Sequence, residues 1–223
     1  MAQIILKNIK KTYDPDVLKK PVLNQLSLSI EAGEFVGIVG PSGSGKTTLL
    51  YVMSGLEKVD SGEVLLFNKP LSTYLESDRA MLRRDLIGFV FQFFNLIPNL
   101  SIYDNLKLAN VIIKNKGLTI EEALNLVGLK DVMHKYPSEL SGGMQQRASI
   151  GRAILGEKKI IFADEPTGNL DYQTSLDIMG LFKELNQKLG ITIVMVTHNE
   201  ALLSYTNRVI RLLDGKIEKD EKR

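Results

Sequence analysis

The sequence contains no cysteine among its 223 residues, which excludes disulfide bonds, thiolate zinc sites and cysteine nucleophiles. It also lacks any apolar run close to the roughly 20 residues of a membrane-spanning helix, and its longest candidate, 191–196, has the length of a strand. The N-terminal MAQIILKNIKK has neither the apolar stretch nor the cleavage site of a secretory signal. We therefore expect a chain that reaches a membrane only by docking to another protein.

Charge is nearly balanced along the chain. There are 28 basic and 26 acidic side chains, which give a formal net charge of +2. Nucleic-acid-binding domains carry a clustered basic face, so we expect no nucleic-acid partner. Hydrophobic residues make up 44% of the chain and charged residues 24%, as in an ordinary globular protein. A chain of this length buries roughly 70–75% of its unfolded surface and needs no covalent staples.

Short apolar runs alternate with helical patterns over most of the sequence. The run at 35–39 is continuous, which is typical of a strand buried on both faces, and a helix begins at Lys46 after a glycine-rich turn. Another helix is predicted near 175–189. Strands that alternate with helices predict an α/β fold with a mostly parallel sheet. The predicted strands are 4–9, 26–30, 35–39, 63–67, 87–91, 160–163, 191–196 and 209–213.

The character of the sequence changes between 95 and 155. Amphipathic helical spacing replaces the strand pattern, as with Leu106, Ala109 and Ile113 on one expected face. We interpret 95–155 as a helical subdomain inserted into a core formed by 1–94 and 156–223, all within a single domain, 1–223. The mixed-charge C-terminal KIEKDEKR predicts a frayed tail.

A complete phosphate-loop motif, G-x-x-x-x-G-K-[ST], follows the strand at 35–39. Its glycines let backbone N–H groups approach phosphate oxygens, and the following helix adds the positive end of its dipole. We expect Lys46 to contact the β- and γ-phosphates and the Thr47 hydroxyl to bind Mg²⁺. The predicted nucleotide-binding residues here are Gly40, Pro41, Ser42, Gly43, Ser44, Gly45, Lys46, Thr47 and Thr48.

Two adjacent carboxylates follow the apolar strand at 160–163. Asp164 stands at the strand end, where phosphate-loop NTPases hold the Mg²⁺ shell. Glu165 is placed to point towards the γ-phosphate and to polarise an attacking water. In isolation such a pair is usually a solvated strand end. Its position after the phosphate loop and the segment described next favours catalysis.

A second glycine-rich turn, Ser141-Gly142-Gly143, opens a helix within LSGGMQQR. Ser141 is a good N-cap, which alone would indicate only a helix start. The two glycines also bare backbone N–H groups at the helix N-terminus, which makes a second anion site. Because one chain has one phosphate loop, this site is suited to a nucleotide bound by another subunit.

Together the phosphate loop, LSGGMQQR and ADEPTGNLD resemble the nucleotide-binding subunit of ABC (ATP-binding cassette) transporters, over nearly the whole chain. The resemblance implies the ABC ATPase fold, with an N-terminal antiparallel β part, and an ATP-dependent head-to-tail homodimer that sandwiches and hydrolyses two ATP molecules. It implies that Gln92 touches Mg²⁺ or the water, that His198 contacts the γ-phosphate and that Tyr13 stacks on adenine. It assigns ATP contacts to Ser141, Gly142, Gly143 and Gln145, and the dimer interface to Ser141, Gly143, Asn169, Leu170 and Asp171.

The segments IGFVFQFFNLIPNLS, YPSELSGGMQQR and ADEPTGNLD look like one subfamily. It contains the ATPases of macrolide exporters, lipoprotein-releasing complexes and antimicrobial-peptide pumps, and also the cell-division ATPase. The resemblance implies a chain held at the cytoplasmic face of the membrane by integral permease subunits. Their coupling helix is expected to contact Phe93, Phe94, Leu96, Ile97 and Leu100.

Two functions within this subfamily stay open. One is an exporter or extractor of peptide, lipoprotein or drug, and the other is a cell-division-type ATPase that drives an extracytoplasmic regulator without transport. Soluble ABC proteins that act on DNA or the ribosome carry a long coiled coil or two cassettes, whereas this sequence has a single cassette without sustained heptads. One mild departure from the family pattern is Gly151, where alanine is usual, and we expect it to loosen the signature helix by up to about 1 kcal/mol.

Overall fold

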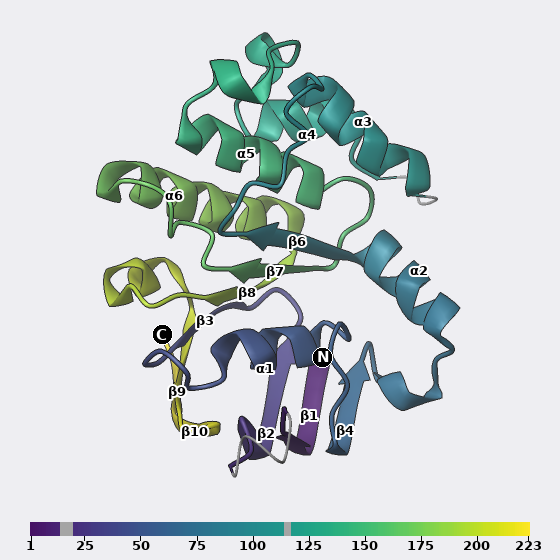
Figure 1. The fold of residues 1–223 in the computed structure, drawn as a ribbon, viewed down its shortest axis with the longest axis vertical. Coiled ribbons are helices and arrows are strands. Elements are labelled where there is room, and N and C mark those ends of the chain that lie inside the picture. The colour runs from purple at the N-terminus through teal and green to yellow at the C-terminus, as the bar shows by residue number, and fades with distance from the viewer. Residues whose placement is uncertain (14–19, 114–116) are drawn as a thin grey trace.

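Two β-sheets with a helix between them form the lower two thirds of the molecule in Figure 1, and a group of helices forms the top. The computed structural model describes residues 1–13, 20–113 and 117–223. The smaller sheet is antiparallel, with strands in the order β2-β1-β4-β5. These strands are β1 (Ala2–Lys11), β2 (Leu23–Glu31), β4 (Ser61–Leu66) and β5 (Lys69–Pro70).

The larger sheet has six strands in the order β10-β9-β3-β8-β7-β6. All neighbouring pairs are parallel except β9 and β10, which are antiparallel. The mostly parallel sheet and the antiparallel N-terminal part are therefore as predicted. The strands are β3 (Phe35–Val39), β6 (Ile87–Phe91), β7 (Ile160–Asp164), β8 (Thr192–Val196), β9 (Arg208–Leu213) and β10 (Lys216–Lys222).

The helices cover both faces of the larger sheet. On one face α1 lies between the two sheets, and its Leu49, Leu50 and Met53 are fully buried in a core shared with both. On the other face α5 and α6 pack, together with α3 and α4, around a second core (Figure 1). The helices are α1 (Lys46–Met53), α2 (Glu76–Leu86), α3 (Ile102–Ile112), α4 (Ile120–Leu126), α5 (Gly142–Ala153) and α6 (Tyr172–Leu189), with short 3-10 turns at Leu71–Thr73, Lys130–Val132, Pro137–Glu139 and Glu200–Tyr205.

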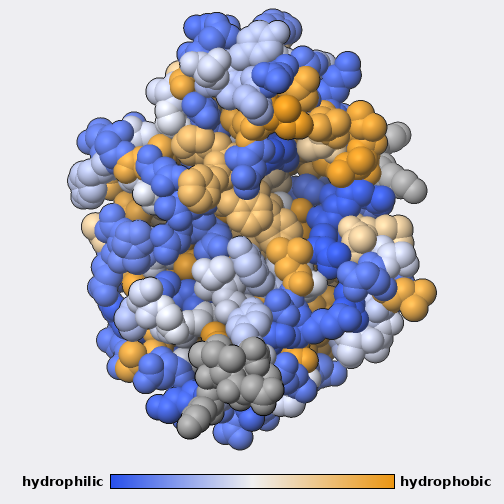
Figure 2. Space-filling model, in the orientation of Figure 1, coloured by the Kyte–Doolittle hydropathy of each residue, from blue (hydrophilic) through white to orange (hydrophobic). Residues whose placement is uncertain are grey.

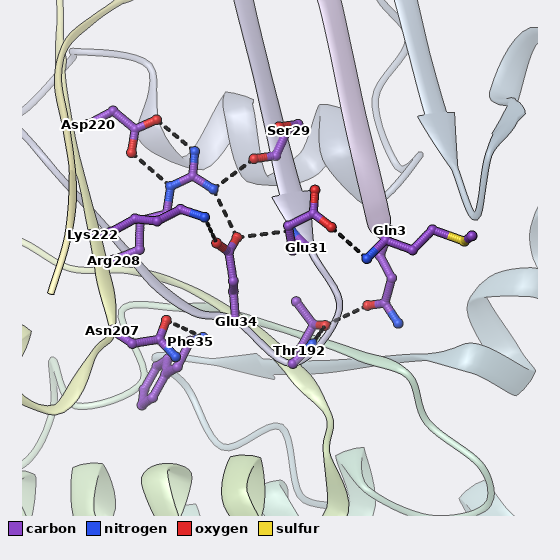
Figure 3. Close-up of polar contacts among 12 residues, drawn as sticks. Gln3, Ser29, Glu31, Glu34, Phe35, Thr192, Asn207, Arg208, Asp220 and Lys222 are labelled. Carbon is purple, nitrogen blue, oxygen red and sulfur yellow. Dashed lines mark hydrogen bonds and ion pairs between the residues drawn. The ribbon is translucent and has the colours of Figure 1, made fainter.

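The C-terminal segment corrects the prediction of a frayed tail. All of KIEKDEKR except the last residue forms β10, because the backbone of this segment pairs with β9 and one of its carboxylates binds a nearly buried arginine. Arg208 donates to both oxygens of Asp220, at 2.8 and 2.7 Å, and also to Glu34 Oε2 and to the Ser29 carbonyl of β2 (Figure 3). This network connects the end of the chain to both sheets.

The helix α2 was not predicted. Its eleven residues include none that is buried, so the apolar periodicity that marks the other helices is missing. Within the part of the chain that the structure describes, no helix combines the length and apolarity needed to cross a lipid bilayer.

Candidate functional site

Four parallel strands end at one edge of the larger sheet. Phe91, Asp164 and Val196 are register partners in β6, β7 and β8, and β3 ends beside β8 at Val39. Ligands of open α/β sheets bind beyond the carboxyl ends of the strands. The sheet thus brings together residues that the sequence places far apart, and those that follow these strand ends are Gly40, Gln92, Glu165, Thr197 and His198.

Two clefts meet at this edge. The first, the nucleotide cleft, has a volume of about 490 Å³ and is lined by Tyr13, Val22, Ser42, Gly43, Gly45, Lys46, Thr47, Thr48, Glu165 and His198. The second, the metal-side cleft, has a volume of about 350 Å³ and is lined by Thr47, Tyr51, Phe91, Gln92, Phe93, Asn95, Asp164 and Glu165. Thr47 and Glu165 belong to both, so they mark the point where the clefts join.

The phosphate loop is shaped by its glycines. Gly43 and Gly45 have φ of +77° and +96°, a region that residues with a side chain rarely adopt. A Cβ at Gly45 would also lie 2.7 Å from the Val22 carbonyl oxygen. Helix α1 follows with no side-chain cap and no acidic residue in its first turn, so its N-terminal N–H groups and dipole are free to bind an anion.

Lys46 and Ser44 lie at the N-terminal end of α1 with polar groups turned to the phosphate loop. The Lys46 ammonium donates to the carbonyl oxygens of Gly40 and Pro41, at 2.9 and 2.8 Å, which keeps it folded over the loop. The buried Ser44 hydroxyl has no hydrogen-bond partner among the described residues. A positive charge and an unused donor beside a helix N-terminus fit a polyphosphate.

Asp164 and Thr47 form a second group at the junction. Thr47 Oγ1 donates to Asp164 Oδ1 at 3.1 Å, and the Tyr51 hydroxyl donates to Oδ2 at 3.2 Å. Burial raises the pKa of Asp164, and the neighbouring Glu165 raises it further, while these two hydrogen bonds and Lys46 act in the opposite direction. A hydroxyl and a carboxylate side by side are hard oxygen ligands of the kind that Mg²⁺ prefers.

Glu165 follows directly, in a conformation unusual for its type. Its φ is +46°, and its N–H donates to the Val196 carbonyl oxygen at 3.0 Å. Strained backbone of this kind persists only where the surroundings fix it, and it is common at active sites. Glu165 Oε2 lies 2.9 Å from His198 Nδ1, and because a carboxylate only accepts, this contact assigns the imidazole proton to Nδ1.

The loops around Glu165 are held by reciprocal amide contacts. The Gln92 side chain donates to Asn169 Oδ1 at 3.1 Å, and the Asn169 side chain donates back to the Gln92 carbonyl oxygen at 3.0 Å. Gln146 of α5 is fully buried, and its Nε2 donates to the carbonyl oxygens of Phe91 and Pro166, the residues before Gln92 and after Glu165. Gln146 of α5 therefore holds together the loop after β6 and the loop after β7.

Ser141-Gly142-Gly143, the turn that opens α5 and is called the signature turn below, lies apart from both clefts. None of Ser141, Gly142, Gly143 or Gln145 is among the described residues that line them. Ser141 caps α5 as predicted, accepting the Met144 N–H at 3.3 Å, while the Gln145 amide donates to the Leu140 carbonyl oxygen. The chain thus presents the signature turn away from its own nucleotide cleft.

Other predicted residues have structural partners of their own. Tyr13 lines the nucleotide cleft, with the Lys11 ammonium 5.1 Å from its ring centre. Asp171 caps α6 by accepting the Thr174 N–H at 3.0 Å, and Leu170 packs partly against the helical core. In the predicted permease-contact segment, Phe93 and Ile97 are exposed, whereas Leu96 packs against that core.

Sequence reasoning missed two residues of this site. Tyr51 lies one helical turn after Thr47, and that spacing of four residues placed it on the same face. Gln146 stands inside the signature, but its burial and its two acceptors depend on how α5 packs against β6, which no local pattern specifies.

Comparisons with known proteins give one consistent picture. The family model described as ABC transporter matches residues 23–168. The bacitracin export ATP-binding protein BceA of Halalkalibacterium halodurans is 42% identical over 97% of this chain and 87% of that protein. The macrolide export ATP-binding/permease protein MacB of Bdellovibrio bacteriovorus is 41% identical over 98% of this chain, which covers 34% of that protein.

Solved structures agree with these relatives. The dimeric structure of MJ0796, a bacterial ABC transporter cassette, superposes with a TM-score of 0.86 at 40% identity and covers 98% of both chains. A second structure of MJ0796 is dimeric in a post-hydrolysis state bound to ADP and Pi, with a TM-score of 0.85 and 39% identity over 98% of both chains.

Proposed function

This chain belongs to the ABC transporter family of ATP-binding subunits and is an ATPase, and from that premise we propose that it is the motor of an exporter or extractor of peptide, lipoprotein or drug. The similarity to proteins named for bacitracin export and for macrolide export supports outward movement. The observation that carries the ATPase mechanism is the junction of the two clefts, where Thr47, Asp164, Glu165 and His198 meet beside the phosphate loop.

Hydrolysis at this junction is a matter of positioning. The phosphate loop and Lys46 hold the β- and γ-phosphates, and Glu165 orients a water in line with the bond to be broken. Water attacks the γ-phosphorus, its proton passes towards Glu165, and the bond to the β-phosphate oxygen breaks to give ADP and phosphate. His198 fixes the Glu165 carboxylate through the 2.9 Å contact, and its proposed partner in the bound nucleotide is the γ-phosphate.

Thr47 and Asp164 are the proposed ligands of Mg²⁺, with Gln92 nearby in the same cleft. When bound, the ion neutralises charge on the β- and γ-phosphates as the bond breaks. The 3.1 Å contact between the Thr47 hydroxyl and Asp164 Oδ1 supports this assignment, because it already brings the two oxygens together.

The active unit of this proposal is a head-to-tail homodimer. Ser141, Gly142, Gly143 and Gln145 close over the ATP of the opposite subunit, and Asn169, Leu170 and Asp171 cross the interface. The position of the signature turn outside its own clefts and the dimeric MJ0796 structures support this arrangement. Each subunit alone then binds ATP but lacks half the donors for hydrolysis.

The permease surface is proposed to include the segment from Phe93 to Leu100. Arg152 of the signature helix donates to the carbonyl oxygens of Asn95 and Phe94, and Asn105 bonds both the N–H and the carbonyl of Ile97. The segment therefore keeps a fixed shape while exposing apolar side chains. Figure 2 shows further apolar surface at the upper right, where Figure 1 places α3, and Leu108, Val111 and Ile112 of that helix are exposed.

Docking there places the chain at the cytoplasmic face of the membrane, against integral permease subunits. The second candidate function is a cell-division-type ATPase that drives an extracytoplasmic regulator. MacB carries the ATP-binding part and a permease in one protein, which supports the expectation of a permease partner. Deleting the gene distinguishes the two functions, because sensitivity to a peptide or drug indicates export and failed cell separation indicates the regulator.

The permease contact is tested by purifying the tagged chain from detergent-solubilised membranes of its own host. Ile97 and Leu213 are each 41% exposed, so Ile97→Ser and Leu213→Ser are matched substitutions inside and outside the proposed surface. We expect the unchanged chain and Leu213→Ser to retain a stoichiometric permease and Ile97→Ser to lose it, with ATPase activity of the isolated subunit kept in all three. A chain that stays soluble, or returns with ribosomes or nucleic acid, would refute the motor-subunit proposal.

A further inference from the structure

Tyr51 lines the metal-side cleft from the last turn of α1. Its hydroxyl donates to Asp164 Oδ2 at 3.2 Å, while Thr47 Oγ1, one turn earlier on the same helix, donates to Oδ1 at 3.1 Å. Each oxygen of the Asp164 carboxylate therefore has its own hydroxyl donor, and α1 supplies both. A single helix fixes the carboxylate at two points.

We propose that Tyr51 is a positioning residue for the Mg²⁺ site: its hydroxyl holds Oδ2 of Asp164 and leaves Oδ1, on the Thr47 side, for the metal. This inference rests on the proposed assignment of Thr47 and Asp164 as metal ligands. Tyr51 itself does not touch the metal or the phosphates. It acts only through the carboxylate.

The carboxylate needs such a partner because its own torsion is loose. The terminal torsion of an aspartate is broad and roughly two-fold, so Asp164 alone can present either oxygen, or both, to an ion. Mg²⁺ demands near-ideal octahedral geometry and tolerates misplaced ligands poorly. A donor on Oδ2 selects one orientation before the ion arrives.

The hydrogen bond from Tyr51 would not have to break when the metal binds, because it lies on Oδ2 of Asp164 and not on Oδ1. The Thr47 hydroxyl would bind the metal through an oxygen lone pair and would still have its proton to donate to Oδ1, so Asp164 would keep both hydrogen bonds. Partners of metal ligands typically contribute about 10–100-fold to metal affinity.

Tyr51 has a second, structural role that the test must separate. Its ring packs against the core between the two sheets. Tyr51→Phe removes the hydroxyl and keeps the ring. Tyr74→Phe is the matched control, because Tyr74 also packs its ring against that core, with the Lys69 ammonium 4.1 Å from the ring centre, and does not line the metal-side cleft.

The measurement is the affinity for a non-hydrolysable fluorescent ATP analogue, once with excess Mg²⁺ and once with EDTA. The ratio of the two affinities reports how strongly the protein uses the metal. For Tyr51→Phe we expect this ratio to fall about 10-fold, with the affinity in EDTA unchanged. Tyr74→Phe should match the unchanged chain, and Asp164→Asn should bring the ratio close to one. Raising Mg²⁺ should restore the ATPase rate of Tyr51→Phe.

Other results separate the failure of this inference from the failure of the proposed site. An unchanged ratio in Tyr51→Phe, with a reduced ratio in Asp164→Asn, would overturn the role of Tyr51 and leave the Mg²⁺ site standing. A loss of affinity in EDTA equal to the loss in Mg²⁺ would reduce Tyr51 to a packing residue. A ratio near one in the unchanged chain would overturn the Mg²⁺ site itself, and the role of Tyr51 with it.

Discussion

The phosphate loop and the signature turn are both glycine-rich turns that open a helix, yet glycine is required in them for different reasons. Gly43 of the phosphate loop has φ of +77°, and a Cβ there would have no neighbour within 4 Å among the residues that the structure describes. Gly143 of the signature has no such dihedral angle, but a Cβ there would lie 2.5 Å from Thr174 Cγ2 of α6. Gly43 is therefore required for its conformation and Gly143 for its size, while Gly45 of the phosphate loop, with φ of +96° and a Cβ position 2.7 Å from the Val22 carbonyl oxygen, is required for both.

The surroundings of the two turns differ in the same way. Around the phosphate loop the chain supplies its own Lys46, Thr47, Asp164 and Glu165, so this half of the site is complete in one subunit. Around the signature turn the closest side chains are those of Leu170, Phe94 and Thr174, which pack against it. The contrast supports the proposal that the phosphate loop binds nucleotide within one subunit and that the signature turn acts across a dimer.

The largest expected effect is a loss of ATP turnover without a loss of ATP binding or dimerisation. Glu165→Gln keeps the shape of the side chain but removes the carboxylate that orients the water, so turnover should fall by on the order of 10²–10⁴. The phosphate loop and signature turn are untouched, so ATP should still bind and the dimer should accumulate. Turnover is measured by phosphate release and the dimer by size-exclusion chromatography with ATP. Glu184→Gln, on the exposed side of α6, is the control, and near-normal turnover in Glu165→Gln would refute the assignment.

The next largest effect is expected from a substitution that alters only the phosphate loop. Lys46→Ala removes a charged donor that is nearly buried beside the proposed phosphate position. Hydrogen bonds to charged groups contribute about 1.5–3 kcal/mol, so ATP affinity should fall about 10–100-fold. Binding of a fluorescent ATP analogue to the monomer measures this. Unchanged affinity would show that the ammonium stays on the carbonyl oxygens of Gly40 and Pro41 when nucleotide binds.

A smaller effect is expected from a substitution that alters only the signature turn. Gly143→Ala forces Thr174 of α6 to move, and overpacking of this kind typically costs about 1–3 kcal/mol. ATP-dependent dimerisation should weaken about 10-fold, while the monomer's ATP affinity stays the same. The second substitution Thr174→Ser removes the clashing methyl and keeps the hydroxyl that bonds Asp171, at 2.6 Å. Recovery in the double variant would assign the effect to packing, and no recovery would assign it to a direct contact with the opposite subunit's nucleotide.

Sequence patterns predicted the phosphate-loop side better than the elements that hold it together. The strands at 35–39 and 87–91 were predicted to the residue, because continuous apolar runs ending at a glycine or polar residue mark buried strands. The glycine spacing of the phosphate loop follows from local dihedral demands that a sequence states directly. The roles assigned to Glu165, His198 and Gln92 stay predictions, although the structure brings these residues to one edge.

The missed features depend on contacts between distant segments. The C-terminal KIEKDEKR lacks the alternation of apolar and polar residues that marks a strand. Its strand structure depends instead on pairing with β9 and on the Arg208–Asp220 contact. Gln146 gives no sequence signal of its burial, because its acceptors lie 55 and 20 residues away. The need for a small residue at Gly143 is equally hidden in the sequence, because the residue that limits its size lies on another helix. Local chemistry is readable in a sequence, and close packing between elements is not.

The smallest expected effect is on the free energy of unfolding, and it concerns glycines inside helices, where neither a left-handed dihedral angle nor a severe clash requires glycine. Gly151 in α5 has neither a left-handed dihedral nor a hard clash, because its Cβ would lie 3.3 Å from Val127 Cγ2 and 3.6 Å from Leu106 Cδ2. A Cβ on Gly180 in α6 would have no described residue within 4 Å, so Gly180→Ala should gain the full helix-propensity difference of about 1 kcal/mol in free energy of unfolding. Gly151→Ala should gain less, because α3 and α4 must yield by a few tenths of an ångström. Denaturant unfolding of both variants measures the difference. Equal gains would mean that α3 and α4 yield freely around α5, and a net loss for Gly151→Ala would place this glycine with Gly143, among those kept for their size.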